Sequence, residues 1–340
     1  MKNFIKSFFL ICIISILSNC SSEELTYSVI KKQVHKNAVD NRYLDKNDGI
    51  TVVTVGTGSP FPGDRAQTAT AIFVNGHFFM FDVGAGAVQK SEKFGLPLHK
   101  LDAIFFTHYH SDHCMDLPNM ISRSWQRGRT LNLNIYGPQG LNQLMASVDN
   151  FLEIDNTYRL AHHGIEVMDT TFADGIAREF FMEQNAHQVI YENDGIKITA
   201  FDVTHEPIEP AVGYKIEYNG KKIVISGDTK KNNLLMEMAQ GSDLLIHEAM
   251  IMTFQQMLAK ANKEAGLDRN AQIITDIQDY HTSPKEAAET AKESNVKVLV
   301  LNHLAPAPDN KTLKKMYLNE MNVFEGKKYL ANDGDVFFVK

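Results

Sequence analysis

The chain has few cysteines: its 340 residues include three, at positions 12, 20 and 114. Two of these lie within the first twenty residues, so the remaining chain carries only Cys114 and cannot form an intrachain disulfide there. We expect Cys114, which directly follows His113, to be a small buried residue behind the neighbouring histidines. A metal ligand or nucleophile is the alternative.

The chain also has no excess of positive charge. It contains 34 Lys and Arg against 41 Asp and Glu, a formal net charge of -7. This balance makes a polyanion a weaker expectation than a small anionic ester substrate, although a net value can hide a local basic patch. With 44% hydrophobic and 22% charged residues, the composition is that of an ordinary globular protein.

No apolar run has the length expected of a transmembrane helix. The run 8–17 follows Lys2 and Lys6 and suits a signal-peptide core. The stretch 17–22, Leu-Ser-Asn-Cys-Ser-Ser, resembles a bacterial lipoprotein box with Cys20 as the lipidated residue. We therefore expect a signal peptide over 1–20, a polar tether over 21–48, a catalytic domain over 49–340, and an exported lipoprotein facing the periplasm or cell exterior. Ordinary signal cleavage and an uncleaved anchor are the alternatives.

One stretch concentrates metal-capable side chains behind a predicted strand. Residues 107–113 read Thr-His-Tyr-His-Ser-Asp-His, after the apolar run 101–106. Alternation along an extended segment would send His108, His110 and Asp112 to one side. A turn would then direct His113 to a second ion, about 3.5–4 Å from the first. A solvated histidine-rich loop is the alternative.

Further predicted strands end on the same residue types. Asp82 follows the strand 77–81 and precedes Gly84 and Gly86; we interpret it as an acceptor for a metal-bound histidine. A glycine-rich phosphate loop is the competing interpretation, but no Lys stands at P-loop spacing. Four later predicted strands are each followed by a residue of the same types: His205, Asp228, His247 and His303.

The residue types suggest two metal sites. His108, His110 and His205 would form one nitrogen-rich zinc site; Asp112, His113 and His303 would form the other, and Asp228 would bridge them. Two zinc ions would generate a metal-bound hydroxide as nucleophile, although Mn²⁺ or Fe²⁺ suits such ligands too. Asp112 or Asp228 could orient the hydroxide, and His247 could protonate the leaving oxygen.

Two histidine-containing segments have less certain roles. The pair His162 and His163 suits a substrate rim as well as it suits a surface or core position. We expect His281, which begins a His-Thr-Ser sequence, to lie behind the metal ligands or at the substrate rim. Ser283, Pro284 and Glu286 predict a capping box and a helix extending to about residue 293.

The ordered motifs resemble the metallo-β-lactamase superfamily over roughly 50–340. This resemblance implies an α+β fold, an αββα sandwich of two facing mixed β-sheets flanked by helices. The metal-ligand roles known for this family match those assigned above. The resemblance also implies that the His of the His-Glu-Ala motif lies near the scissile ester. Four motifs resemble the ribonuclease Z branch and its arylsulfatase-like relatives: 136–140, 226–229, 246–249 and 281–283.

Within this branch, ribonuclease Z is a cytoplasmic enzyme whose Gly/Pro-rich arm clamps transfer RNA. No Pro occurs between Leu141 and Thr204, which indicates that the arm is absent, and the stretches 125–129 and 155–164 resemble the arylsulfatase-like members. We therefore expect an arylsulfatase-like hydrolase of small sulfate or phosphate esters. The alternative is a ribonuclease Z-type phosphodiesterase acting on RNA or cyclic nucleotides. A non-catalytic zinc lipoprotein is a third hypothesis, and the resemblance also suggests a homodimer.

Overall fold

The computed structural model describes residues 22–38, 43–44 and 48–340. It divides into two compact units, Met1–Arg42 and Tyr43–Lys340. In the first unit, helix α2 (Ser22–Ala38) occupies most of the expected tether. The tether prediction follows from the absence of apolar periodicity. Such periodicity marks a helix that packs on another element, but it does not mark a helix whose side chains are exposed. The predicted signal peptide and Cys20 lie outside the described residues. Among the described helices, none has the length and apolarity needed to cross a membrane.

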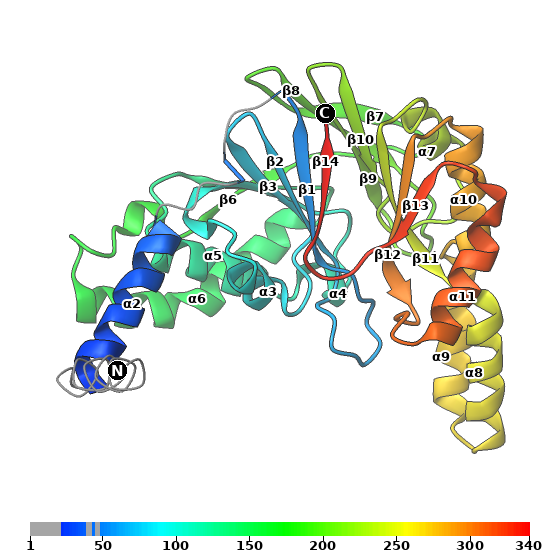
Figure 1. Ribbon diagram of the computed structural model, residues 1–340, viewed down its shortest axis with the longest axis horizontal. Coiled ribbons are helices and arrows are strands. Elements are labelled where there is room, and N and C mark those ends of the chain that lie inside the picture. The colour runs from blue at the N-terminus through cyan, green and yellow to red at the C-terminus, as the bar shows by residue number, and fades with distance from the viewer. Residues whose placement is uncertain (1–21, 39–42, 45–47) are drawn as a thin grey trace, which may run out of the picture. The chain divides into compact units, whose positions relative to one another are not determined.

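The second unit is built on two seven-stranded sheets (Figure 1). Both sheets are mixed, because antiparallel pairs on one side give way to parallel pairs on the other. The first, in spatial order, is β14 (Asp335–Val339), β1 (Ile50–Gly56), β2 (Ala69–Val74), β3 (His77–Phe81), β4 (Leu101–Phe105), β5 (Leu133–Gly137) and β6 (Gly175–Glu179). The second is β13 (Lys327–Leu330), β12 (Val298–Ala305), β11 (Leu244–Met250), β10 (Lys221–Ile225), β9 (Val212–Tyr218), β8 (Ile196–Asp202) and β7 (His187–Asn193).

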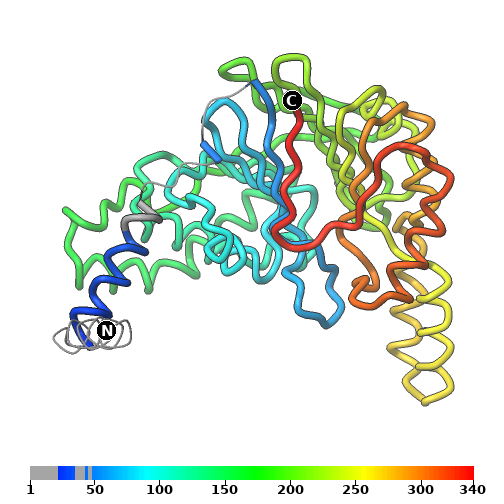
Figure 2. Tube along the Cα trace, viewed as in Figure 1, coloured from blue at the N-terminus to red at the C-terminus, as the bar shows by residue number. Residues whose placement is uncertain are grey.

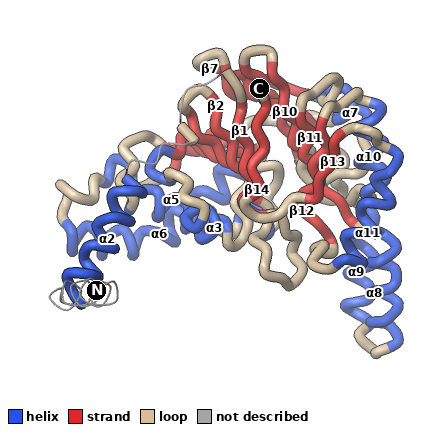
Figure 3. Tube along the Cα trace, viewed as in Figure 1, coloured by secondary structure: helices blue, strands red, loops and turns tan. Residues whose placement is uncertain are grey.

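Helices cover the outer face of each sheet (Figure 3). They include α3 (Ala87–Lys93), α5 (Leu117–Gln126) and α6 (Leu141–His163) on the first sheet, and α7 (Asn233–Met238), α10 (Pro284–Glu293) and α11 (Lys311–Glu320) on the second. The inner faces meet in a third apolar cluster that includes Phe79, Phe105, Tyr214 and Ile246. The αββα sandwich predicted from the sequence is confirmed, and so is the capping box at Ser283.

Apolar and almost continuously buried runs explain the central strands, whereas the pattern over 141–194 is weak and the stretch over 250–279 predicts only an ill-defined helical segment. Two strands there, β6 and β7, are edge strands with exposed side chains, so their apolar pattern is weak. The helices α8 (Met252–Glu264) and α9 (Asp268–Asp276) pack mainly on each other. In Figure 1 this helical pair extends beyond the strands.

Arg129 is a buried cation that holds several segments together. It is 2% exposed, and its guanidinium donates hydrogen bonds to Ser124 Oγ (3.0 Å), Leu131 O (2.8 Å) and Asp174 O (3.3 Å). Burial lowers its pKa to about 10, so the group is still charged at neutral pH. Nearby, Trp125 Nε1 donates to Asp169 O (2.8 Å). These contacts give the Trp-Gln-Arg-Gly-Arg stretch a structural role, in place of the expected role as a mark of substrate type.

We expect the change Arg129→Ala to lower the free energy of unfolding by about 2–4 kcal/mol, because it leaves buried carbonyl groups without donors. Chemical denaturation measures this difference. The matched control is Arg127→Ala, which removes an exposed guanidinium paired with Glu92 at 2.6 Å and should cost less than about 1 kcal/mol. Equal effects of the two changes would contradict the structural role of Arg129.

His77 joins the two sheets through a pair of carboxylates. Its Nδ1 lies 3.4 Å from Asp102 Oδ1 on β4, and its Nε2 lies 3.0 Å from Asp194 Oδ2 in the β7–β8 turn. The hydrogen bond with Asp102 is the main cause of the raised pKa of His77; burial opposes it and Asp194 adds to it. The protonated ring therefore stabilises the folded chain.

This raised pKa predicts a pH dependence with a definite sign. The stabilisation by His77 is fully present below its unfolded pKa of about 6.5 and is lost as the pH rises through the higher folded pKa. We expect the stability difference between the wild type and His77→Gln to be larger at pH 5.5 than at pH 9, by roughly 1 kcal/mol or less. Denaturation of both proteins at the two pH values measures it, and a difference that grows with pH would refute the assignment.

Candidate metal centre

The candidate site lies where strands of both sheets reach their carboxyl ends. Asp82 follows β3, His108 follows β4, His205 follows β8 and Asp228 follows β10. His303 lies within β12 at a register shift against β11 and has a positive φ of 46°. Such a bulge redirects one side chain out of the regular alternation. The backbone irregularity at His303 therefore belongs to the construction of the site.

The order of the ligand-type residues matches the prediction, but their local geometry differs from it. His110 precedes the short helix α4 (Ser111–Cys114), and Asp112 and His113 occupy its first turn. A helical turn rather than strand alternation therefore separates this pair from His108. Side chains alternate only while the chain is extended, and the chain enters helix α4 after His110.

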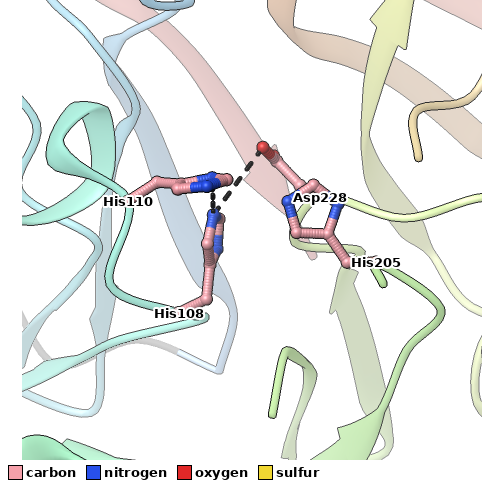
Figure 4. A group of neighbouring side chains, drawn as sticks. All are labelled: His108, His110, His205 and Asp228. Atoms are coloured by element: carbon pink, nitrogen blue, oxygen red, sulfur yellow. Dashed lines mark hydrogen bonds and ion pairs between the residues drawn. The ribbon is translucent and has the colours of Figure 1, made fainter. Parts of the chain in front are cut away.

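The structure brings the predicted ligands together in two main groups. In the first, His108 Nε2 lies 3.0 Å from His110 Nδ1 and 3.9 Å from Asp228 Oδ2. Figure 4 shows these side chains converging with His205 from two sides. The metal-capable groups among the described residues are His108, His110, His205 and Asp228; Asp112, His113 and His303; and Asp228, His281 and His303.

Asp228 connects the groups. Its Oδ2 lies 3.2 Å from His113 Nε2 and 3.4 Å from His303 Nε2, and Asp112 Oδ2 lies 3.0 Å from His303 Nε2. Although burial disfavours the cation, Asp228 and Asp112 raise the pKa of His303 to about 9. Excess negative charge in this buried cluster is therefore balanced by protonated histidines, which a bound cation would replace.

Hydrogen bonds orient the rings so that one nitrogen of each is left for a metal. His113 Nδ1 donates to Asp82 Oδ2 (2.9 Å), and His205 Nδ1 donates to Tyr280 O (2.9 Å). Asp82 also accepts from Thr107 N and Oγ1, both at 2.9 Å. The Nε2 atoms of His113 and His205 are buried and have no hydrogen-bond partner. Two buried ring nitrogens that have no hydrogen-bond partner and lie near carboxylates are suitable ligands for divalent metal ions.

A cavity of about 340 Å³ opens beside this cluster. His110, Asp112, Asp228, His281 and His303 line it, together with apolar residues from other elements. Reactants could therefore reach the metal-capable side chains from solvent.

His281 lies at the cavity, as expected of a rim residue, whereas His247 does not lie where a leaving-group acid is expected. His281 lines the cavity, and its Nδ1 lies 3.1 Å from Glu248 Oε1. His247 is fully buried, does not line the cavity, and has its Nδ1 2.8 Å from Glu248 O. On β11, Ile246 belongs to the cluster between the sheets and Ala249 to the cluster under the helices. Alternation therefore turns His247 away from the site and Glu248 toward it, so the predicted acid role of His247 does not fit this structure.

Glu248 is the functional residue that the sequence analysis overlooked. Its Oε1 accepts hydrogen bonds from Thr282 N (2.9 Å) and Thr229 N (3.3 Å), in addition to its contact with His281. Burial, with Asp228 nearby, raises the pKa of this carboxyl well above its ordinary value. The signal was present, because the two threonines and Glu248 stand inside three of the recognised motifs.

The geometry also bears on two pairs of alternatives, for His162 with His163 and for Cys114. His162 and His163 lie exposed at the end of α6 with their rings 4.7 Å apart, and they do not line the cavity. Cys114 is a free thiol whose Sγ lies 3.6 Å from Tyr109 O, and burial raises its pKa to about 11. A thiol with such a pKa is not a thiolate nucleophile at neutral pH, and it belongs to none of the metal-capable groups found in the described chain.

An αββα sandwich with clustered His and Asp side chains at the strand ends defines a metal-dependent hydrolase. Residues 77–304 match the Beta-lactamase superfamily domain. The ribonuclease Z of Mycolicibacterium paratuberculosis is 32% identical over 262 residues, spanning 76% of this chain and 87% of the relative. That of Mycobacterium bovis is 30% identical over 288 residues, spanning 84% and 96%. The chain belongs to the metallo-β-lactamase superfamily, in its ribonuclease Z branch.

Solved structures agree on the fold. The short form of human tRNase Z shares 22% identity, with a TM-score of 0.62 over 85% of this chain and 99% of that one. The metallo-β-lactamase fold protein YhfI from Bacillus subtilis shares 20% identity, with a TM-score of 0.61 over 86% of this chain and all of that one.

These relatives overturn two expectations. The arylsulfatase-like assignment is wrong, because the relatives that match most of this chain are named ribonuclease Z. It depended on the lack of Pro between Leu141 and Thr204 and on the stretches 125–129 and 155–164, whose residues serve packing or lie on the surface. The expectation of an exported lipoprotein is also wrong by the same comparison, since the family that matches is the one described above as cytoplasmic. A small anionic ester and a lipid anchor likewise find no support.

Proposed function

We propose that this protein is a ribonuclease Z-type phosphodiesterase that cleaves RNA with the help of two zinc ions. The observation that carries the proposal is the convergence of eight metal-capable side chains, seven of them the predicted ligands, with Asp228 within reach of both main groups. It gains support from relatives named ribonuclease Z that cover most of both chains. The catalytic unit is the body over 49–340.

The metal-ligand roles follow from the two groups. His108, His110 and His205 hold one ion, and Asp112, His113 and His303 hold the other, with Asp228 shared. Zinc suits the nitrogen-rich donor set, and Mn²⁺ or Fe²⁺ would also be accepted. When bound, two such ions lower the pKa of water and neutralise charge that develops on the phosphoryl group.

The chain's own residues supply the proton transfers. Asp112 and Asp228 are carboxylates at the cavity wall and can accept the proton of the attacking water. His281 lines the same cavity, and Glu248 holds its Nδ1. The other ring nitrogen of His281 is thereby fixed in orientation and can donate a proton to the leaving oxygen.

Cleavage of RNA tests the proposal. We expect the zinc-loaded full chain to cleave a single-stranded RNA or an RNA with a single-stranded 3′ extension, as followed on a denaturing gel. Treatment with a chelator should abolish cleavage, and added zinc should restore it. An RNA left intact by a protein that contains two zinc ions would refute the proposal.

A further inference from the structure

The cavity beside the metal-capable cluster has two chemically different walls. One wall carries imidazoles and carboxylates, including Asp228 and His281. The other is apolar and comes from two separate elements, the β1–β2 loop with Phe61 and the α9 segment with Ile273 and Ile277. Figure 2 shows this loop and the α8–α9 pair protruding on the same side of the fold. Such a cavity suits a ligand that is anionic at one end and apolar at the other.

The apolar wall has no structural partner that would explain it. Ile273 is 49% exposed although it stands on a helix whose Ala271 and Ile274 are buried. Ile273 and Ile277 are four residues apart and therefore lie on the same side of the chain, facing the cavity. The helical pair thus buries one face and leaves an apolar edge beside the site.

Tyr280 connects this wall to the metal-capable residues. Its ring lies edge-on to the ring of His205, with centroids 4.9 Å apart, and 5.0 Å from the ring of His281. The aromatic surface therefore begins next to the histidine that faces the leaving oxygen in the proposed reaction. No Lys or Arg is among the lining residues, all of which belong to the described chain, so the apolar end of the cavity offers no second anion site.

We propose that this apolar wall binds the base of one unpaired nucleotide next to the cleaved phosphodiester. The inference rests on the proposed function and adds which part of the RNA the cavity recognises, namely one unpaired base. A nucleotide has the required two ends, and base faces stack on aromatic side chains without regard to sequence. A volume of about 340 Å³ lies at the low end for small-molecule sites, about 300–1,000 Å³. It accommodates one nucleotide, and a paired base would first have to leave its stack.

Binding of two small phosphates tests the inference without relying on cleavage. The probes are adenosine 5′-phosphate and ribose 5-phosphate, titrated calorimetrically into the zinc-loaded full chain. Both carry the same phosphate, so a difference between them reports the base. We expect the nucleotide to bind at least about tenfold more tightly. Equal affinities, or no binding of either compound, would overturn the inference.

Variants locate the effect. Phe61→Ala and Ile273→Ser should each weaken nucleotide binding by roughly threefold to tenfold and leave ribose 5-phosphate binding unchanged. The matched control is Phe151→Ala, because Phe151 is 72% exposed on α6 and lies outside this cavity. Equal losses for both compounds, or losses in the control as large as in the variants, would also refute base binding at this wall.

The two proposals can fail separately. RNA cleavage without any preference for the nucleotide would refute the base site alone. A nucleotide preference in a protein that leaves every RNA intact would refute the proposed ribonuclease activity alone.

Discussion

Replacement of Asp228 by asparagine is expected to lower kcat for phosphodiester hydrolysis by about 10³-fold or more. The Asp228 Oδ2 atom lies within 4 Å of ring nitrogens from both ligand groups, at 3.9 Å from His108, 3.2 Å from His113 and 3.4 Å from His303. Asparagine keeps the shape of the side chain but supplies no negative charge to two cations. At least one metal should therefore be lost together with the activity.

Steady-state hydrolysis and the zinc content of the purified protein measure this effect. The variant should also lose part of the stabilisation by zinc, which is about 4 kcal/mol when the free metal exceeds its Kd by a thousandfold. The control is Asp155→Asn, in which an exposed carboxylate paired with Arg159 on α6 is neutralised. A variant at Asp228 that retains two zinc ions and normal turnover would disprove the shared-ligand role.

Replacement of His281 by alanine is expected to lower kcat by about 10²–10⁴-fold for RNA, the range of a lost general acid. The loss should be much smaller for a p-nitrophenyl phosphodiester, because p-nitrophenolate leaves without protonation. Zinc content should stay at two ions if His281 acts only as an acid. Because Glu248 holds His281 Nδ1 at 3.1 Å, Glu248→Gln should show the same leaving-group pattern with a smaller loss.

The alternative acid is tested in the same experiment. If His247 protonated the leaving oxygen, His247→Asn would show the dependence on leaving group and His281→Ala would not. A loss of zinc from His281→Ala would instead assign His281 to the third metal-capable group, with Asp228 and His303. Each outcome is visible in the ratio of the two rates and in the metal content.

Much of the site was predictable because its residues follow a local rule. Buried strands end where polar residues begin, so His108, His205 and Asp228 could each be recognised next to an apolar run. The carboxyl ends of neighbouring strands then lie close together, as the alignment of β10, β11 and β12 shows. The alignment of parallel strands explains why residues distant in sequence form one site.

Residue orientation was not predictable in the same way. Alternation along β11 requires His247 and Glu248 to face opposite sides, but it does not say which side is the inner one. The cluster of Ile246 between the sheets decides this. The resemblance to a family pointed to His247 as the acid, whereas the packed sheets place His281 at the cavity.

The sequence by itself determined the fold class, the ligand order and the strand pattern, because these depend on short-range periodicity and on residue chemistry. Tertiary structure decided what the short-range pattern leaves open: the structural role of Arg129, the meeting of Phe61 with Ile273 and Ile277 across one cavity, and the solvent position of His162 and His163. These features depend on contacts between segments far apart in the chain. Such contacts arise only when both sheets and their covering helices have packed.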